Sequence, residues 1–329
     1  MEALPVRSAR TVDLNLLTVR IASNLETFGA YDYFSREASA DAVPDYAVHC
    51  VDLARDAFDE SELTRLADRS LRAQRFRSGY YLSHIFGSPA HLLTRGNSSY
   101  VFGRRLERTV WPYFVKRILT DFAVDHGYLH LKAAGFVQDG GATLLVGPNG
   151  GGKTVFLSQA CLDGAGFLTN THTLVKEGMA HAVPTAVRVR RDSATAQLID
   201  RHRLRAHLES GDHLAPADLL FPGPRVDSAP VRNIVIADHD PDRRRGIEEV
   251  SPPVMEAFLG QFALAVTTYG LKDDLMVHHG GDIGAFTGAL LQMQRQLTGL
   301  VCSSRCFRVN VDMRDPRSRA AVLKEIAAG

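Results

Sequence analysis

A glycine-rich stretch, GPNGGGKT, occupies residues 147–154 and has the side chains and spacing needed to bind phosphate. It satisfies the pattern GxxxxGK[ST], in which glycines let backbone N–H groups turn inward around a phosphate. Lys153 would reach the β and γ oxygens of a nucleotide, and the Thr154 hydroxyl would ligate Mg²⁺. The nucleotide contacts predicted from this glycine loop and the residue after it are Gly147, Asn149, Gly150, Gly151, Gly152, Lys153, Thr154 and Val155.

The segments on either side of the glycine loop are those that a phosphate-binding loop requires. The apolar run ATLLV at residues 142–146 predicts a strand, and TVFLSQACLD at residues 154–163 predicts a helix. A helix that starts inside the loop would add positive potential from its N-terminus. A flexible glycine turn is the alternative interpretation, and the strand and helix around the loop argue against it.

A polar tract lies inside the next strand-like segment, LTNTHTLV at residues 168–175. Its middle contains Asn170, Thr171 and His172, which a buried strand would normally exclude. We interpret Asn170 and Thr171 as residues that contact substrate or phosphate, and His172 as a candidate catalytic residue. A cross-strand hydrogen bond is the structural alternative for His172.

Two further single residues are candidates for catalysis. His130 lies in the apolar segment YLHLKAAGFV at residues 128–137, where the alternative is a hydrogen-bonded core histidine. Asp238 ends the apolar run IVIA, in the position of a carboxylate that binds Mg²⁺, although the sequence DHDP is also typical of a turn.

Two polar groups later in the chain are candidates for binding phosphate or acceptor. Arg188 and Arg190 would share one face of a strand, where they could clamp phosphate or be exposed to solvent. His278, His279 and Asp282 lie in HHGGD, which we predict to be an acceptor-binding or mobile loop. A zinc site is not favoured there, because no third ligand has suitable spacing.

Several of these segments resemble the HPr kinase and phosphoenolpyruvate-carboxykinase-like group of P-loop proteins. The resemblance spans about residues 126–329. The matching features, in chain order, are His130 on the strand before the loop strand, GPNGGGKT, GAGFLTNTHTLVKEGMAHAVP, TAVRVRR and RCFRVNVDMRDP. The resemblance implies an α/β P-loop domain with a mixed, partly antiparallel sheet of the HPr-kinase type, preceded by a smaller α/β domain. We therefore expect an acceptor-selecting or covering domain at 1–125 and a kinase domain at 126–329.

The sequence departs from that group at the catalytic carboxylates. The strand after the P-loop helix usually carries an Asp-Asp pair there, whereas the matching positions look like Asn170 and Thr171. The proton acceptor is therefore to be sought among His130, Asp238 and His172, with His130 as first choice because the resemblance puts it beside the phosphates. The C-terminal signature specific to HPr kinases is also not evident.

The resemblance implies an ATP-dependent kinase that uses Mg²⁺ and transfers the γ-phosphoryl group to a hydroxyl. We expect a small-molecule acceptor, for example a nucleoside- or sugar-like intermediate of secondary metabolism. Two alternatives stay open: a serine kinase acting on protein or amino acid, and a non-catalytic nucleotide-binding regulator. ATP versus GTP preference is also open.

Composition limits the partners and the compartment. The 329 residues contain 38 Lys plus Arg against 37 Asp plus Glu, so no basic excess draws the chain to nucleic acid or an anionic membrane. Apolar runs fall short of the roughly 20 residues that span a bilayer. The four cysteines form no CxxC pair, which favours a reducing cytoplasm. A homo-oligomer is neither required nor excluded.

Overall fold

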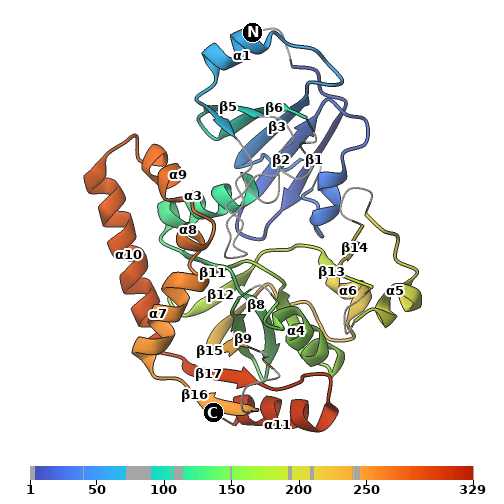
Figure 1. Cartoon of the computed structure of the whole chain (residues 1–329), viewed down its shortest axis with the longest axis vertical. Helices are drawn as coiled ribbons and strands as arrows, with labels where there is room; N and C mark the ends of the chain where they lie inside the picture. The colour runs from blue at the N-terminus through green and yellow to red at the C-terminus, as the bar shows by residue number, and fades with distance from the viewer. Residues whose placement is uncertain are drawn as a thin grey trace. The chain divides into compact units, whose positions relative to one another are not determined.

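The computed structural model describes residues 4–39, 41–71, 90–104, 106, 114–148, 150–191, 195–207, 211–238, 240 and 245–328. The chain divides into two compact units (Figure 1). The N-terminal unit comprises Met1–Ile118 together with His207–Gly211, and the C-terminal unit comprises Leu119–Ala206 with Asp212–Gly329. The two units divide between Ile118 and Leu119, inside helix α3 (Lys116–His126), a few residues before the boundary at residue 125 expected from the sequence.

The N-terminal unit contains a six-stranded sheet with the order β1-β2-β3-β6-β5-β4. Strands β2, β3 and β6 run parallel, and the other neighbours are antiparallel. A 3₁₀ helix η1 and a helix α1 accompany the sheet. The bounds are β1 Ser8–Asp13, β2 Thr18–Ser23, η1 Gly29–Tyr33, β3 Tyr46–Asp52, α1 Glu60–Leu66, β4 Arg69–Leu71, β5 Ala90–Arg95 and β6 Ser98–Gly103.

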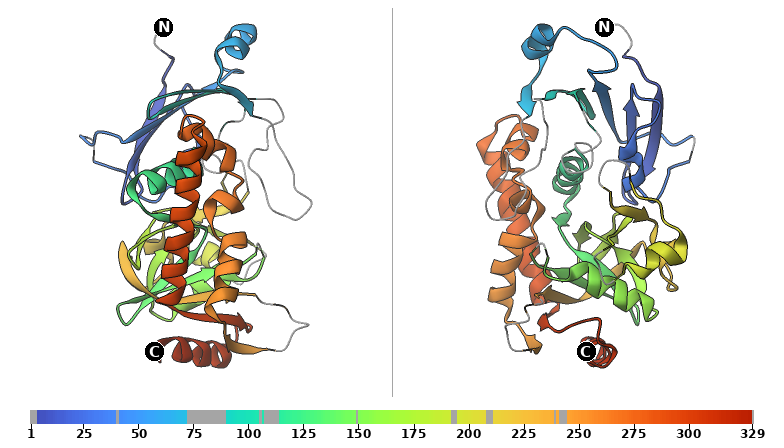
Figure 2. Two further views of the ribbon diagram at one scale, coloured as in Figure 1. Left: turned by 90° about the vertical axis from the view of Figure 1, so that its left-hand side faces the viewer. Right: turned by 45° about the vertical axis from the view of Figure 1, so that its right-hand side comes forward.

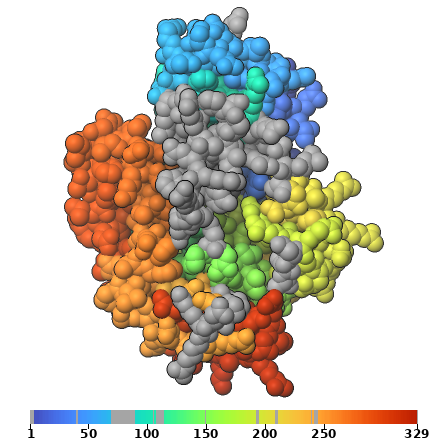
Figure 3. Space-filling model, in the orientation of Figure 1, coloured from blue at the N-terminus to red at the C-terminus, as the bar shows by residue number. Residues whose placement is uncertain are grey.

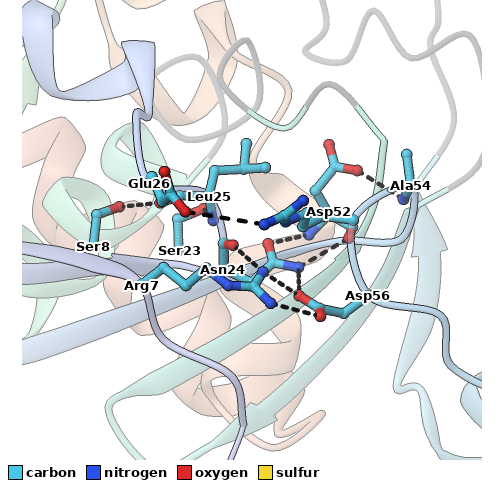
Figure 4. Close-up of polar contacts among 10 residues, drawn as sticks. Arg7, Ser8, Ser23, Asn24, Leu25, Glu26, Asp52, Ala54 and Asp56 are labelled. Atoms are coloured by element: carbon cyan, nitrogen blue, oxygen red, sulfur yellow. Dashed lines mark hydrogen bonds and ion pairs between the residues drawn. The ribbon is translucent and has the colours of Figure 1, made fainter.

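Polar side chains join the carboxyl ends of β2 and β3 (Figure 4). The Arg7 guanidinium donates to both carboxylate oxygens of Asp56, at 2.7 and 3.0 Å. The amide of Asn24 donates to Asp56 at 2.8 Å and to the Asp52 carbonyl at 3.0 Å, and accepts from the Asp52 N–H at 2.7 Å. These bonds pair the backbone N–H and carbonyl of Asp52, at the end of β3, with the Asn24 amide that follows β2.

A segment from later in the chain, His207–Gly211, belongs to the N-terminal unit. The His207 ring is hydrogen-bonded to the Gly29 carbonyl at 2.9 Å and packs 5.2 Å from the ring of Tyr33. Its side chain is almost fully buried. The N-terminal unit is therefore built from two stretches of chain that lie about 90 residues apart.

The described part of the C-terminal unit contains a mixed nine-stranded sheet with the path β10-β8-β9-β15-β12-β11-β7, to which β17 and β16 add beside β15. Strand β15 is parallel to β9 and β17, and the other pairs are antiparallel. The bounds are β7 Leu129–Leu131, β8 Ala134–Gln138, β9 Gly141–Val146, β10 Gly166–Thr169, β11 Thr173–Lys176, β12 Met179–Ala182, β15 Ser228–Ala237, β16 Gly246–Glu249 and β17 Arg305–Asn310. The expected α/β class with a mixed sheet is thus confirmed.

Helices cover this sheet on two sides (Figure 2). Helix α4 packs on β8, β9 and β10, and α10 packs along α7 and against β7 and β17. Phe136, Phe156, Phe167 and Phe307 form the centre of the core under α4. The helices are α3 Lys116–His126, α4 Lys153–Leu162, α5 Gln197–His202, α6 Ala217–Leu220, α7 Pro252–Phe262, α8 Ala265–Thr268, α9 Lys272–His278, α10 Ile283–Cys302 and α11 Pro316–Ala327.

The outer face of α9 and α10 lies at the surface (orange in Figure 3), where Val277, Ile283 and Leu291 are exposed. Such scattered apolar side chains are ordinary on a helix surface. Among the described helices, none has the length and apolar content needed to cross a membrane.

An antiparallel ladder in the C-terminal unit opens in its middle. Strands β7 and β11 pair Leu131 with Thr173, and β8 and β10 pair Gly135 with Thr169, so three residues lie between the two pairs on each strand. The register is therefore the same across the gap. Residues 132–133 and 170–172 lie outside the strands, and we call this gap the ladder break.

The ladder break corrects the expected continuous strand over residues 168–175. The hydroxyl of Thr169 donates to the carbonyl of His172 at 2.6 Å, a side-chain bond that turns the backbone away from the ladder. On the other strand, the Lys132 N–H donates to the Ala263 carbonyl beside α7 at 2.7 Å. Both bonds satisfy backbone groups that a regular ladder would otherwise pair.

Candidate functional site

The sheet brings the glycine loop and Asp238 to the same edge. Strands β9 and β15 are parallel and adjacent, with Val146 opposite Ile236. The glycine loop follows β9 directly, and Asp238 follows the last residue of β15. Carboxyl ends of parallel strands are where open α/β sheets bind ligands. The predicted pairing of loop and carboxylate is thus compatible with the register of the sheet.

Two glycines of the loop press against the end of β15. A Cβ atom added to Gly147 or to Gly151 would lie 2.6 Å from the carbonyl oxygen of Ala237, closer than any side chain tolerates. Gly147 also has a φ of +139°, which L residues rarely adopt. The loop therefore needs glycine at both positions in order to wrap the strand end.

Helix α4 begins inside this loop. Its N-cap is Gly152, in a left-handed conformation, and no described side chain caps the helix. The first backbone N–H groups of α4 are therefore available to an anion, which the helix dipole would also favour. Thr154 is exposed in the first turn, Val155 is half-buried, and Gly150 has a positive φ. Asn149 lies outside the described residues.

The ammonium group of Lys153 folds back over the loop. Its Nζ donates to the carbonyls of Gly147 and Pro148, at 2.8 and 2.7 Å. Burial lowers the pKa of Lys153 to about 8, and the nearby charge of Lys132 adds to this shift. The lysine is thus held where a phosphate bound in the loop would meet it.

Lys132 is a candidate site residue that the sequence reasoning missed. Strands β8 and β9 pair Ala134 with Leu145, and continuing that register by two residues places Lys132 opposite Gly147. Its side chain is half-buried, and its Nζ lies 6.0 Å from the centre of the Tyr269 ring. The one signal in the sequence is a charged residue within the apolar run YLHLKAAGFV.

The two candidate histidines are brought together. His130 Nε2 and His172 Nδ1 are hydrogen-bonded at 2.9 Å, and His130 Nδ1 is hydrogen-bonded to the Thr120 hydroxyl at 2.9 Å. Both rings are buried. The ring of Tyr269 packs 5.5 Å from His172, and burial raises the pKa of its hydroxyl, which stays neutral. Neither Thr120 nor Tyr269 had been predicted, since only the fold connects them to the histidines.

Asn170 and Thr171 lie in the ladder break and are half-buried. The Asn170 amide donates to the Ala186 carbonyl at 3.4 Å. Because β10 ends at Thr169 beside β8, these two residues reach the same sheet edge as the glycine loop. Their contact with a substrate remains a prediction.

The predicted strand over TAVRVRR is shorter than expected and belongs to a separate two-stranded sheet of β13 (Val187–Val189) and β14 (His213–Ala215). Arg188 and Arg190 both face Asp212, with Nε to carboxylate distances of 3.1 and 3.5 Å. The two guanidinium groups share one partner, as their spacing predicted. The described partner is a carboxylate, and phosphate binding by this pair stays untested.

The expected loop over HHGGD is instead a short turn between two helices. Helix α9 ends at His278, His279 is its C-cap, and Asp282 caps α10 by accepting from the Ala285 N–H at 3.0 Å. His278 Nε2 lies 2.7 Å from a carboxylate oxygen of Asp125 on α3. An aspartate before an apolar helical run is a strong N-cap signal, and it accounts for the start of α10 directly after the turn; binding of an acceptor by His278, His279 and Asp282 stays a prediction.

The oxygen ligands near the loop fit a magnesium ion bound through phosphate. Among the described residues, no group of three or more His, Cys, Asp or Glu side chains is placed to hold a metal by itself. Mg²⁺ on a nucleotide needs only one or two protein oxygens, because phosphates and water supply the rest. The Thr154 hydroxyl and the Asp238 carboxylate are ligands of that type.

A scan against models of known protein families finds no match to this chain, and neither does a search of curated proteins.

Proposed function

We propose that the C-terminal unit binds ATP with Mg²⁺ at the glycine loop and transfers the γ-phosphoryl group to a hydroxyl. The observation that carries this proposal is the loop itself, packed between β9 and α4. Its glycines wrap the end of β15 against Ala237, and Lys153 closes over it. This strand, loop and helix arrangement is what the phosphate-binding pattern requires. It supports the P-loop kinase group, with an HPr-kinase-like sheet, as the family of this unit.

The loop and the start of α4 would hold the phosphates through backbone N–H groups. Lys153 would exchange its bonds to the Gly147 and Pro148 carbonyls for bonds to phosphate oxygens. Charge-assisted bonds of this kind are roughly twice as strong as neutral ones. Thr154 and Asp238 would hold Mg²⁺, which neutralises charge on the β and γ oxygens.

During transfer, the acceptor oxygen forms a bond to phosphorus, the bond to the leaving ADP oxygen breaks, and the acceptor hydroxyl loses its proton. Asp238 and the histidine pair can receive that proton. His130 already has Thr120 and His172 at its two nitrogens, so it would take up a proton through His172. We propose the histidine pair as the first candidate for the proton acceptor and Asp238 as the second.

The acceptor would enter at the ladder break. Asn170 and Thr171 present an amide and a hydroxyl there, groups suited to recognising a compact polar molecule. We therefore propose a small-molecule acceptor, of which a nucleoside- or sugar-like compound is one example.

A nucleotide-binding regulator is the second candidate function. The residues of the ladder break include no carboxylate, so the usual pair of acidic groups for metal and base is lacking at 170–172. A regulator would bind ATP at the same loop without turning it over. Incubation with γ-labelled ATP and pools of small metabolites separates the two, because a kinase yields a labelled small product. Label on protein alone would favour a protein kinase.

Lys153→Ala tests the glycine loop directly. We expect this variant to lose measurable binding of Mg·ATP in titration calorimetry, because the cation nearest the phosphates is removed. Lys176→Ala is the matched control, since Lys176 also donates to a backbone carbonyl, that of His126, but lies on β11 outside the loop. Unchanged ATP affinity in a folded Lys153→Ala protein would contradict the proposed function.

A further inference from the structure

Lys132 lies between the two halves of the candidate site. Continuing the β8–β9 register places it opposite Gly147, the first residue of the glycine loop. The pairs Gly135–Thr169 and Leu131–Thr173 flank the ladder break, so Lys132 and His172 both lie in the stretch between them; a β-bulge shifts the register of β10 between Phe167 and Thr169. Lys132 therefore lies just before β8, a strand that pairs on one edge with β9, which leads into the glycine loop, and on the other with β10, which leads into the polar tract.

The position of Lys132 is fixed by its surroundings. Its backbone N–H donates to the Ala263 carbonyl at 2.7 Å, and Leu131 forms a bridge with Leu264. Its ammonium group lies 6.0 Å from the ring centre of Tyr269, whose ring also packs against His172. Helices α7 and α8 therefore hold the lysine from one side while the sheet holds it from the other.

Electrostatics agree with this position. Burial lowers the pKa of Lys132, and its charge lowers the pKa of Lys153, so the two ammonium groups repel each other. An anion bound near both ammonium groups would offset this repulsion.

We propose that Lys132 is a second phosphate-binding lysine, which contacts the terminal phosphate of the bound nucleotide from the side opposite Lys153. This inference rests on the proposed function. The loop N–H groups and α4 would grip the inner phosphates, whereas Lys132 lies toward the ladder break, where the acceptor would enter. Lys132 therefore recognises the group that is transferred, and it makes the site prefer ATP to ADP.

The test is the affinity for Mg·ATP and for Mg·ADP, each measured by titration calorimetry on the full chain. In Lys132→Gln, we expect ATP binding to weaken by about 10- to 100-fold, the usual effect of losing a hydrogen bond to a charged group. ADP binding should change little, so the preference for ATP falls. Lys132→Arg keeps the charge and should retain most of the preference.

Two further variants serve as a backup and a control for this test. Lys132→Met retains the apolar stem that packs in the site, and it should repeat the loss of ATP preference if the glutamine variant fails to fold. Lys176→Gln is the matched control, because Lys176 also lies over an aromatic ring, that of Tyr128 at 5.2 Å. It should leave both affinities unchanged.

The outcomes distinguish this inference from the proposed function. Suppose that Lys153→Ala abolishes nucleotide binding, but Lys132→Gln and Lys132→Met weaken the binding of ATP and ADP equally or change neither. Lys132 then does not contact the terminal phosphate, and the proposed nucleotide site is unaffected. If Lys153→Ala also binds ATP normally, the nucleotide site itself is wrong.

Discussion

In the proposed transfer, three side chains are candidates to receive the proton of the acceptor hydroxyl: His130, His172 and Asp238. The histidines are hydrogen-bonded to each other, so they act as one unit. We expect His130→Ala and His172→Ala each to lower kcat by roughly 10²- to 10⁴-fold, the usual span for a general base, while ATP affinity is kept. The double variant should lower kcat little more than either single variant does, because the effects of mutating coupled residues are not additive.

The matched variant for this prediction is Asp238→Asn, measured with the same acceptor. If both histidine variants keep a kcat near that of the wild type and Asp238→Asn loses it, the proton goes to the carboxylate. A change in ATP affinity with Mg²⁺ in Asp238→Asn would instead report on metal binding, which separates the two roles of Asp238.

One hydroxyl bond, from Thr169, contributes to the ladder break beside the Lys132–Ala263 backbone bond. In Thr169→Val, the His172 carbonyl loses the bond that it accepts at 2.6 Å, inside the core. Leaving a buried carbonyl unsatisfied costs about 1–3 kcal/mol, so we expect the free energy of unfolding in urea to fall by that amount. Turnover should fall as well, because the backbone of His172 loses the bond that positions it beside His130.

Thr173→Val is the control for the ladder break. Thr173 is equally buried, but its hydroxyl bond to the Ala133 carbonyl is long, at 3.5 Å. This variant should therefore cost less stability than Thr169→Val and leave turnover close to the wild type. Equal losses in the two variants would mean that the Thr169 bond does not define the break.

Local patterns in the sequence predicted part of these elements. The apolar run, glycines and helical segment around residues 147–154 act locally, so strand β9, the loop and α4 could be inferred from them. The ladder break could not be inferred from the sequence, because it depends on a backbone bond to Ala263 and on a side-chain bond. Neither leaves a trace in the alternation of apolar and polar residues. Lys132 was missed for the same reason, since its contacts with Ala263 and Tyr269 are made by segments far away in the sequence.

Protonation of two half-buried histidines links the stability of the whole chain to pH. Burial lowers the pKa of His49 and of His181 from the ordinary value of 6.5. Above that value both rings are neutral in the folded and unfolded chain. As pH falls below it, the unfolded chain takes up protons that the folded chain resists, so the free energy of unfolding falls.

Urea unfolding at pH 7.5 and pH 5.5 measures this effect. We expect His49→Gln to reduce the loss of stability between the two pH values, because His49 stacks on Tyr100 in the N-terminal sheet and cannot be charged there without cost. His181→Gln should act likewise on the C-terminal unit. The same pH dependence in the wild type and both variants would show that other groups dominate.

The segment His207–Gly211 also bears on how the protein is made. A ribosome releases residues 1–118 long before it reaches His207, whose ring packs against Gly29 and Tyr33. Domains generally fold in the order of synthesis, but the N-terminal unit lacks one of its pieces until about residue 211 has emerged. Its completion therefore waits until the glycine loop and most of its sheet have left the ribosome, and a shortened gene that stops near residue 118 would encode an incomplete unit.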